Sequence, residues 1–263
     1  MKNRSTVGAR VFALLLGGAL SAHAGFISIQ VGCEVKEDQL VVRVENVGDE
    51  PAQNIFATVD FQGQTHETEI AQSFPPNKPV SKSFPLDMTG LKGVYPAIVV
   101  IDFEDLNAYS FSAVSLQLAR VGAVARTKLN GVLERVEMRQ KAKTKLTVRN
   151  DDGKDITAKL RVVTPREITA ASPAETVTVP ANGITKVTIV LENLSGTPSS
   201  SYPIHALLEY DDDGTHFCET AMTTIPVLAA NPATVGRFWI VLAIVVVIAA
   251  ILFAPKLKKM LAK

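Results

Sequence analysis

The sequence has few of the residues and motifs from which enzymes build active sites. Four of its 263 residues are histidine, and it has no Gly-x-Ser-x-Gly elbow, no His-Glu-x-x-His zinc motif and no glycine-rich phosphate loop. Catalysis needs a nucleophile beside its base, or paired carboxylates in one cleft. The acidic residues of this chain instead fall in turns or alternate with apolar residues. We therefore expect a protein that is not an enzyme and that uses no cofactor or metal.

Aromatic residues are also scarce, at 6% of the chain, and the one tryptophan, Trp239, lies in an apolar C-terminal stretch. Carbohydrate-binding sandwiches usually stack the C–H face of a sugar on flat aromatic rings. Before that stretch the chain offers four tyrosines: Tyr95, Tyr109, Tyr202 and Tyr210. Three of them (95, 202 and 210) recur at matching positions of an internal repeat, which indicates packing. Glycan binding is therefore disfavoured and stays an alternative.

Neither sign of charge is in large excess, because 27 lysines and arginines oppose 26 acidic residues and the formal net charge is +1. Proteins that bind nucleic acid through its phosphates carry a strong positive field. We expect no nucleic acid partner.

The chain has two cysteines, Cys33 and Cys218. One lies near the start of the central part of the chain and the other near its end. A disulfide between them would close a very long loop and join the two halves. Two separate thiols are the alternative. A sequence does not supply the geometry that a bridge requires, so both interpretations stay open.

The first 24 residues fit a secretory signal peptide. A positive segment that ends at Arg10 precedes a short apolar core over residues 11–20 and the small-residue cleavage site Ala22-His23-Ala24. The apolar core is too short to span about 30 Å of hydrocarbon. We predict a signal peptide over residues 1–24.

The C-terminal end fits a membrane anchor. Residues 238–254 are uninterrupted apolar sequence, close to the shortest length that spans a bilayer as a helix. Four lysines follow, and positive charge is retained on the cytoplasmic side. We predict a single transmembrane helix over residues 237–255 and a cytoplasmic tail over residues 256–263. The body would then lie on the periplasmic face of the cytoplasmic (inner) membrane.

Between these ends, short runs of alternating apolar and polar residues are separated by turn residues. "LVVRVEN" places Leu40, Val42 and Val44 on one face, and "KLTVRNDDG" places Leu146 and Val148 on one face before a turn signal. This period of two is typical of strands, and strands at this spacing favour a β-sandwich. We predict an all-β body.

The body also contains an internal repeat. "LVVRVENVGDEPAQNIFATVDF" is matched by "TKLTVRNDDGKDITAKLRVV", and each copy carries Val-x-Asn, ending at Asn46 and Asn150. Further along, "GVYPAIVVIDFED" is matched by "SSYPIHALLEYDDDG", with Tyr95-Pro96 aligned to Tyr202-Pro203. We predict two tandem immunoglobulin-like β-sandwich domains, over residues 25–122 and 123–230.

The order "VRVENVGDEPAQN", a proline- and serine-rich middle, and "GVYPAIVVIDFED" resembles the CARDB-like immunoglobulin-type domains of bacterial and archaeal surface proteins. It is also similar to the related sandwich domain found beside some bacterial α-galactosidases. The resemblance covers most of both copies and consists of strands and turns rather than catalytic residues. The second copy departs from it at Asn150-Asp151-Asp152-Gly153. The resemblance implies a spacer, an adhesion module or an assembly platform.

The stretch "EYDDDG", residues 209–214, has acidic residues at alternate positions and a glycine at its sixth position, like half of a calcium loop. An EF-hand needs a bidentate Glu at position twelve, which here is Thr220. Asp and Gly are also the preferred residues of a tight hairpin turn. We predict a turn; a weaker calcium site on Asp211, Asp212 and Asp213 is the alternative, and these residues are also candidates for partner contact.

Basic residues gather between residues 120 and 149. Alternation along a strand would place several on one outer face, where they could contact anionic lipid, an anionic envelope polymer or an acidic partner. A solvated edge that resists aggregation is the simpler interpretation. The candidate contact residues are Arg135, Arg139, Lys141, Lys143 and Lys145.

Together these patterns predict a membrane-anchored, extracytoplasmic protein-interaction or assembly scaffold whose partner is another envelope protein. One alternative is a surface module or adhesin that binds a glycan or another ligand. Another is an accessory subunit of a separate envelope hydrolase.

Overall fold

The computed structural model describes residues 25–171, 175–229 and 244. The described body consists of strands joined by turns and loops, so the predicted all-β class is confirmed. No helix within the described residues is long and apolar enough to cross a membrane. The predicted signal peptide, transmembrane helix and cytoplasmic tail lie outside the described residues, apart from Ile244.

The first seven strands form a sandwich around one core, called here the N-terminal sandwich. One sheet has the order β1-β2-β5 and the other β4-β3-β6-β7. The strands are β1 (Ile29–Lys36), β2 (Gln39–Asn46), β3 (Ala52–Phe61), β4 (Gln64–Phe74), β5 (Val80–Pro85), β6 (Gly93–Glu104) and β7 (Ser110–Val121). Leu40, Val42 and Val44 are fully buried in this core, as their alternation predicts.

The remaining strands form the C-terminal sandwich around a second core. One sheet has the order β11-β13-β9-β8 and the other β12-β10-β14-β15. The strands are β8 (Leu129–Leu133), β9 (Lys141–Asn150), β10 (Ile156–Val163), β11 (Ile168–Ala171), β12 (Thr176–Val179), β13 (Ile184–Asn193), β14 (Ser201–Asp212) and β15 (Thr215–Pro226). Leu146 and Val148 are fully buried in this second core.

The repeated asparagine makes the same bonds in both sandwiches. Asn46 Nδ2 donates to the carbonyls of Glu50 and Phe74, and Asn46 Oδ1 accepts the N–H of Gly48. Asn150 repeats this pattern with the carbonyls of Lys154 and Val179 and the N–H of Asp152. Both side chains are buried. In the turn after each strand some backbone N–H and C=O groups have no partner in a neighbouring strand, and the amide of the asparagine bonds them instead. The Val-x-Asn repeat therefore marks one structural device used twice.

The repeated tyrosines also match. Tyr95 is the third residue of β6, and its hydroxyl contacts the backbone N–H and carbonyl of Lys92. Tyr202 is the second residue of β14, and its hydroxyl accepts the N–H of Thr197. A tyrosine that bonds the backbone a few residues upstream is the tyrosine corner of immunoglobulin-like sandwiches.

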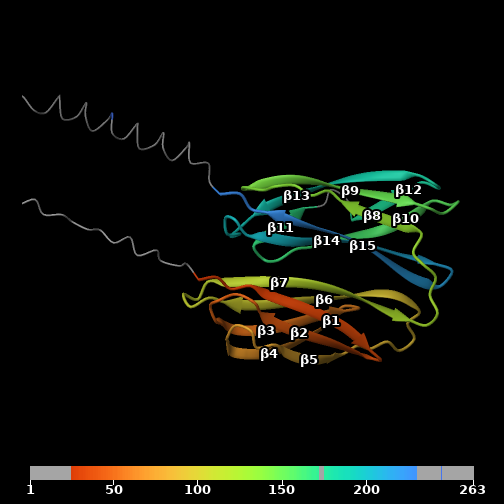
Figure 1. Ribbon diagram of the computed structural model, residues 1–263. Coiled ribbons are helices and arrows are strands. Elements are labelled where there is room, and N and C mark those ends of the chain that lie inside the picture. Colours follow the sequence, from red (N-terminus) through yellow and green to blue (C-terminus); the bar gives the residue numbers. More distant parts are fainter. Residues whose placement is uncertain (1–24, 172–174, 230–243, 245–263) are drawn as a thin grey trace, which may run out of the picture.

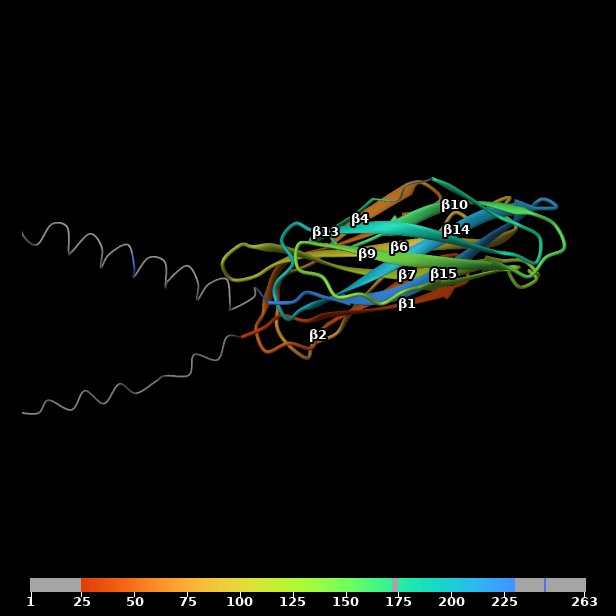
Figure 2. The same cartoon turned by 90° about the horizontal axis from the view of Figure 1, so that it is seen from above.

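The two sandwiches pack face to face (Figure 1). The outer face of β6 and β7 lies against the outer face of β14 and β15, and the view from above shows the sandwiches overlapping (Figure 2). At one point the sheets also join edge to edge, where β15 pairs with β6 in parallel through His216 and Gly93. The described chain starts and finishes at the same end of this body (Figures 1 and 2).

Candidate interaction surfaces

The acidic stretch 209–214 is the end of one strand and a tight turn. Asp212 of β14 pairs with Thr215 of β15, which leaves Asp213 and Gly214 as a two-residue loop. Both loop residues have positive φ, 48° and 68°. This is the Asp-Gly type I′ geometry, whose twist matches the flanking strands. The predicted turn is confirmed.

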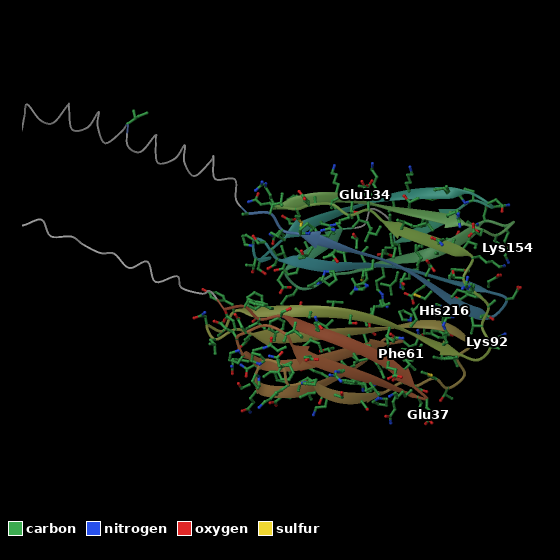
Figure 3. The ribbon with its side chains drawn as sticks, in the orientation of Figure 1. Glu37, Phe61, Lys92, Glu134, Lys154 and His216 are labelled. Atoms are coloured by element: carbon green, nitrogen blue, oxygen red, sulfur yellow. The ribbon has the colours of Figure 1, made fainter. Side chains whose placement is uncertain are left out.

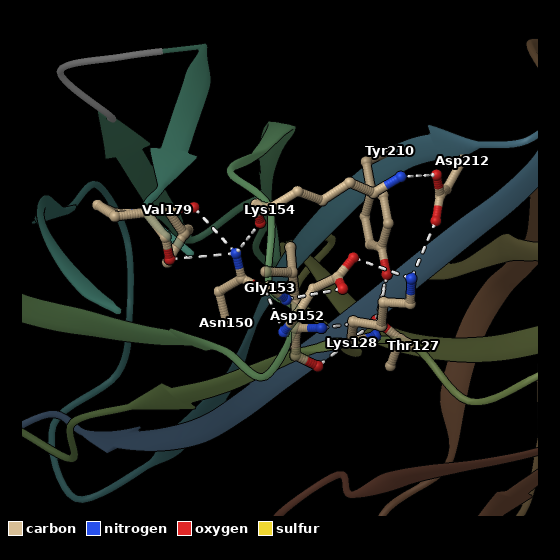
Figure 4. A network of polar contacts seen from close by, with 11 residues as sticks. Thr127, Lys128, Asn150, Asp152, Gly153, Lys154, Val179, Tyr210 and Asp212 are labelled. Carbon is tan, nitrogen blue, oxygen red and sulfur yellow. Dashed lines mark hydrogen bonds and ion pairs between the residues drawn. The ribbon is translucent and has the colours of Figure 1, made fainter. Parts of the chain in front are cut away.

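The carboxylate of Asp212 is held by lysines from two other segments (Figure 4). Lys128 Nζ lies 3.2 Å from Asp212 Oδ2 and 2.9 Å from Asp152 Oδ2, and Lys154 Nζ contacts Asp212 Oδ1. The hydrogen bonds from Lys154 and Lys128 hold the pKa of Asp212 below its usual value. Asp212 is thus committed to bonds inside the C-terminal sandwich.

The neighbouring acids behave differently. Asp211 and Asp213 are exposed, and Asp211 Oδ1 lies 2.9 Å from Nδ1 of His216. Within the described ranges, no group of three or more His, Cys, Asp or Glu side chains is arranged to hold a metal ion. Of the three predicted acidic contact residues, Asp211 and Asp213 therefore face solvent, whereas Asp212 is bonded to Lys128 and Lys154.

The predicted basic residues divide between a strand and a loop. Lys141, Lys143 and Lys145 alternate on the exposed face of β9, whereas Arg135 and Arg139 are exposed in the segment between β8 and β9. Arg139 donates to the carbonyl of Ala229, at the end of the described body.

The structure adds neighbours to the three lysines that were not predicted. On β13, Lys186 lies opposite Thr147 of β9, and Ile184 lies opposite Arg149. On β8, Val132 also lies opposite Thr147. Paired residues of antiparallel strands project to the same side of the sheet. Figure 3 shows nitrogen-tipped side chains projecting from this outer surface.

We call this surface the basic face. Its cations are Lys141, Lys143, Lys145, Arg149 and Lys186. Two of them are in ion pairs: Lys141 with Glu192, and Arg149 with Asp151. Two large apolar side chains lie on it in solvent, with Val132 61% and Ile184 60% exposed. The basic face therefore combines positive charge with exposed apolar area.

The contact between the sandwiches has an apolar centre. Val94 of β6, Leu207 of β14 and Cys218 of β15 are buried together, with Leu116 and Leu118 of β7 packed against them. β14 is buried almost continuously from Tyr202 to Leu208 because it has a core on each face. The continuous runs "PAIVVI" and "IHALL" are the signal that could have revealed this contact, since strands buried on both faces lose alternation.

Polar contacts surround that centre. Arg161 Nη1 lies 3.2 Å from Asp60 Oδ2, and Arg166 Nη1 lies 3.6 Å from Asp102 Oδ1. Glu167, 1% exposed, accepts the backbone N–H and the hydroxyl of Ser112. Burial raises the pKa of Glu167. These contacts fix the register of one sandwich on the other.

Both cysteines are free, so the structure contains the two separate thiols and not the bridge. Cys33 Sγ on β1 lies 3.7 Å from Ser115 Oγ and packs against the N-terminal core. Cys218 lies in the contact between the sandwiches, where burial raises its pKa.

A groove of about 540 Å³ opens between the sandwiches at the end where the described chain starts and finishes. Apolar walls from β1 and β7 meet the loop before β14, and Glu167 lies on its lining. The walls include Phe26, Ile29, Phe111 and Val114.

The tyrosines predicted to pack do so. Tyr95, Tyr202 and Tyr210 are at most 8% exposed, whereas Tyr109 is 67% exposed. Among the four tyrosines, Tyr109 alone presents a ring to solvent.

No family model matches this chain, and no curated protein matches it. Among solved structures, it is similar to a Salmonella α-2-macroglobulin reacted with methylamine, at 13% identity and a TM-score of 0.34, over 78% of this chain and 16% of that one. The periplasmic chaperone SfaE matches at 14% identity and a TM-score of 0.33, over 77% of this chain and 100% of that one. The cupredoxin domain of amoB from Nitrosocaldus yellowstonii matches at 16% identity and a TM-score of 0.26, over 34% and 57% of the two chains. The chain spans less than two thirds of the length of the first solved structures that it matches.

Proposed function

We propose that this chain is a non-catalytic scaffold, anchored by a single C-terminal span in the inner membrane, whose body lies in the periplasm and binds another envelope protein. The basic face carries the proposal, because it displays cations around exposed Val132 and Ile184 on a rigid sheet. Association through such a face is steered by charge and stabilised by apolar burial. The partner is a protein with an acidic patch.

The sequence supports the anchorage and the exported location through the signal-peptide pattern of residues 1–24 and the apolar residues 238–254. A CARDB-like assignment of each sandwich belongs to the same proposal. It is supported by the strand order and the matched turns around Asn46 and Asn150.

Site-specific photo-crosslinking in intact cells tests the basic face. A photoreactive residue at Val132 or Ile184 should give one adduct, identified by mass spectrometry, and the same residue at exposed Ser83 of β5 should give none. The combined change Lys143→Glu, Lys145→Glu and Lys186→Glu should abolish the adduct, whereas Lys78→Glu on the other sandwich should not. Equal adducts from Ser83, or adducts that survive the triple change, contradict the proposal.

The groove favours a second candidate, a surface module that binds a small ligand with an apolar part, because apolar side chains of β1 and β7 line it beside polar groups and it is open to solvent. Native mass spectrometry of the full chain purified from cells should then detect a bound small molecule. That molecule should be lost in Val114→Trp, which fills the groove, and kept in Val132→Trp. A chain without bound ligand in both the wild type and the control argues against this candidate.

A further inference from the structure

Four large apolar side chains lie exposed on loops at one end of the body. They are Phe26 at 56%, Leu106 at 62%, Tyr109 at 67% and Leu194 at 63% exposure. We call this set the apolar tip. Both sandwiches contribute to it, since the loop between β6 and β7 carries two of the residues and the loop between β13 and β14 carries Leu194.

Hydrogen bonds hold the segments that carry Phe26 and Leu194 on the body. The N–H of Phe26 donates to Asp49 Oδ1, and the carbonyl of Phe26 accepts the N–H of Asp49, which lies in the segment after β2. The N–H of Leu194 donates to the carbonyl of Glu167, and the carboxylate of Glu167 binds Ser112 at the start of β7. The groove between the sandwiches is lined from the same segments.

The loop that carries Leu106 and Tyr109 is held by its own polar groups. Asp105 Oδ1 accepts the N–H groups of Asn107 at 2.8 Å and Tyr109 at 2.9 Å. The backbone of Asp105 also exchanges bonds with Ala108 and Tyr109. Because these bonds hold the backbone of the loop, the loop presents two apolar side chains on an ordered turn.

The chain leaves the described body at this same end. The carbonyl of Ala229 accepts a bond from Arg139, whose own carbonyl accepts from Asn193, next to Leu194. Eight residues, 230–237, separate Ala229 from the apolar sequence 238–254. Fully extended, eight residues reach roughly 26–29 Å. The opposite end of the body carries Glu37, Lys92, Lys154 and His216 (Figure 3), together with exposed Ile184.

From this arrangement we propose that the apolar tip inserts into the surface of the membrane that anchors the chain. The inference rests on the proposed anchorage. Tyrosine prefers the boundary between headgroups and acyl chains, and leucine and phenylalanine gain by leaving water there. With the tip in the bilayer surface, the body stands on its loop end and the basic face remains free to bind a partner.

Tryptophan quenching by brominated lipids tests the proposal on the full chain in lipid nanodiscs. In the wild type, Trp239 is the one tryptophan and reports the anchor. In the Trp239→Phe background, Tyr109→Trp and, separately, Leu194→Trp report the tip. Ile184→Trp is the matched control, because Ile184 is equally exposed and begins β13 at the opposite end of the strand from the tip.

The expected result is strong quenching for Trp239 and for both tip variants, several-fold greater than for Ile184→Trp. Quenching of Trp239 with tip variants no more quenched than Ile184→Trp overturns the inference and leaves the anchorage intact; the tip would then face another protein. An unquenched Trp239 overturns the anchorage itself, and the tip proposal with it.

Discussion

The ring of Tyr95 in the N-terminal sandwich stacks on the ring of His216 in the C-terminal sandwich, with centroids 4.5 Å apart and planes 10° from parallel. The same pair sits where the two sheets join, because the N–H of His216 donates to the carbonyl of Lys92 at 3.0 Å. The Tyr95 hydroxyl contacts the backbone of that same Lys92. One tyrosine corner therefore serves both the fold of its own sandwich and the attachment of the other.

The pH dependence of this joint follows from His216. Its contacts with Glu209 and Asp211 raise its pKa, which burial opposes. When the pKa of a histidine is higher in the folded state, its charge adds to the free energy of unfolding. That contribution is complete below the unfolded pKa of about 6.5 and is lost as the pH rises through the folded pKa. His216→Phe keeps a stacking ring and loses the charge. We expect it to lower the free energy of unfolding by up to about 1 kcal/mol at pH 5.5 and by less at pH 8.5.

Urea unfolding at the two pH values measures this difference. Tyr95→Phe is the control, because it removes a hydroxyl whose loss should cost similar stability at both values. A His216→Phe deficit that is constant or grows with pH contradicts the assignment.

Gly93 should tolerate no side chain. Its φ is 135°, and a Cβ there would lie 2.1 Å from the carbonyl oxygen of His216. Gly93→Ala forces the edge contact apart and strains the backbone, which we expect to cost about 1–3 kcal/mol. Differential scanning calorimetry should show a lower Tm, with the two sandwiches less coupled. Gly153→Ala, with no atom within 4 Å of the added Cβ, should leave Tm nearly unchanged; an equal effect of both changes would refute the explanation.

The repeated asparagines should be equally costly to remove. Asn46→Ala leaves the carbonyls of Glu50 and Phe74 and the N–H of Gly48 without their amide partner, and Asn150→Ala does the same in the other sandwich. Each buried orphan group costs about 1–3 kcal/mol. Chemical denaturation should show a large loss for both variants and little for Asn130→Ala, which is exposed on β8. A mild effect at either buried position would contradict the shared device.

The thiols should react only slowly in the folded protein. Burial raises the pKa of Cys33 and of Cys218, so little thiolate is available at neutral pH. We expect maleimide to label half-buried Cys33 before Cys218, and both quickly in denaturant. On a gel, the protein should also run as one band at the same position with and without reductant. Protection from maleimide in denaturant that reductant removes would show a bridge instead.

Local patterns predicted much of the strand structure because strands and turns are local. Alternation placed Leu40, Val42, Leu146 and Val148 inward, and the Asp213-Gly214 turn followed from the positive φ that glycine and aspartate accept. The matched asparagines indicated the repeat because one asparagine side chain can hydrogen-bond several backbone groups of the turn that follows it.

The candidate surfaces were predicted less completely. The alternating lysines of β9 were predicted to share an outer face, and they do. Their neighbours Lys186, Ile184 and Val132 come from other strands, and strand register is a tertiary property. Asp212 looked like its acidic neighbours in the sequence, yet lysines 58 and 84 residues away occupy its carboxylate.

Residues close together in the chain suffice to specify that this body is made of strands, where the chain turns and which strand faces point into a core. The tertiary structure alone decided which outer faces meet. The face of β14 that carries His205, Leu207 and Glu209 could have faced water. It is covered because the outer face of β6 and β7 offers apolar side chains, and Asp102 of β6 pairs with Arg166 beside them. That choice buries Cys218, separates it from Cys33 and directs the apolar tip to the end from which the chain leaves the body.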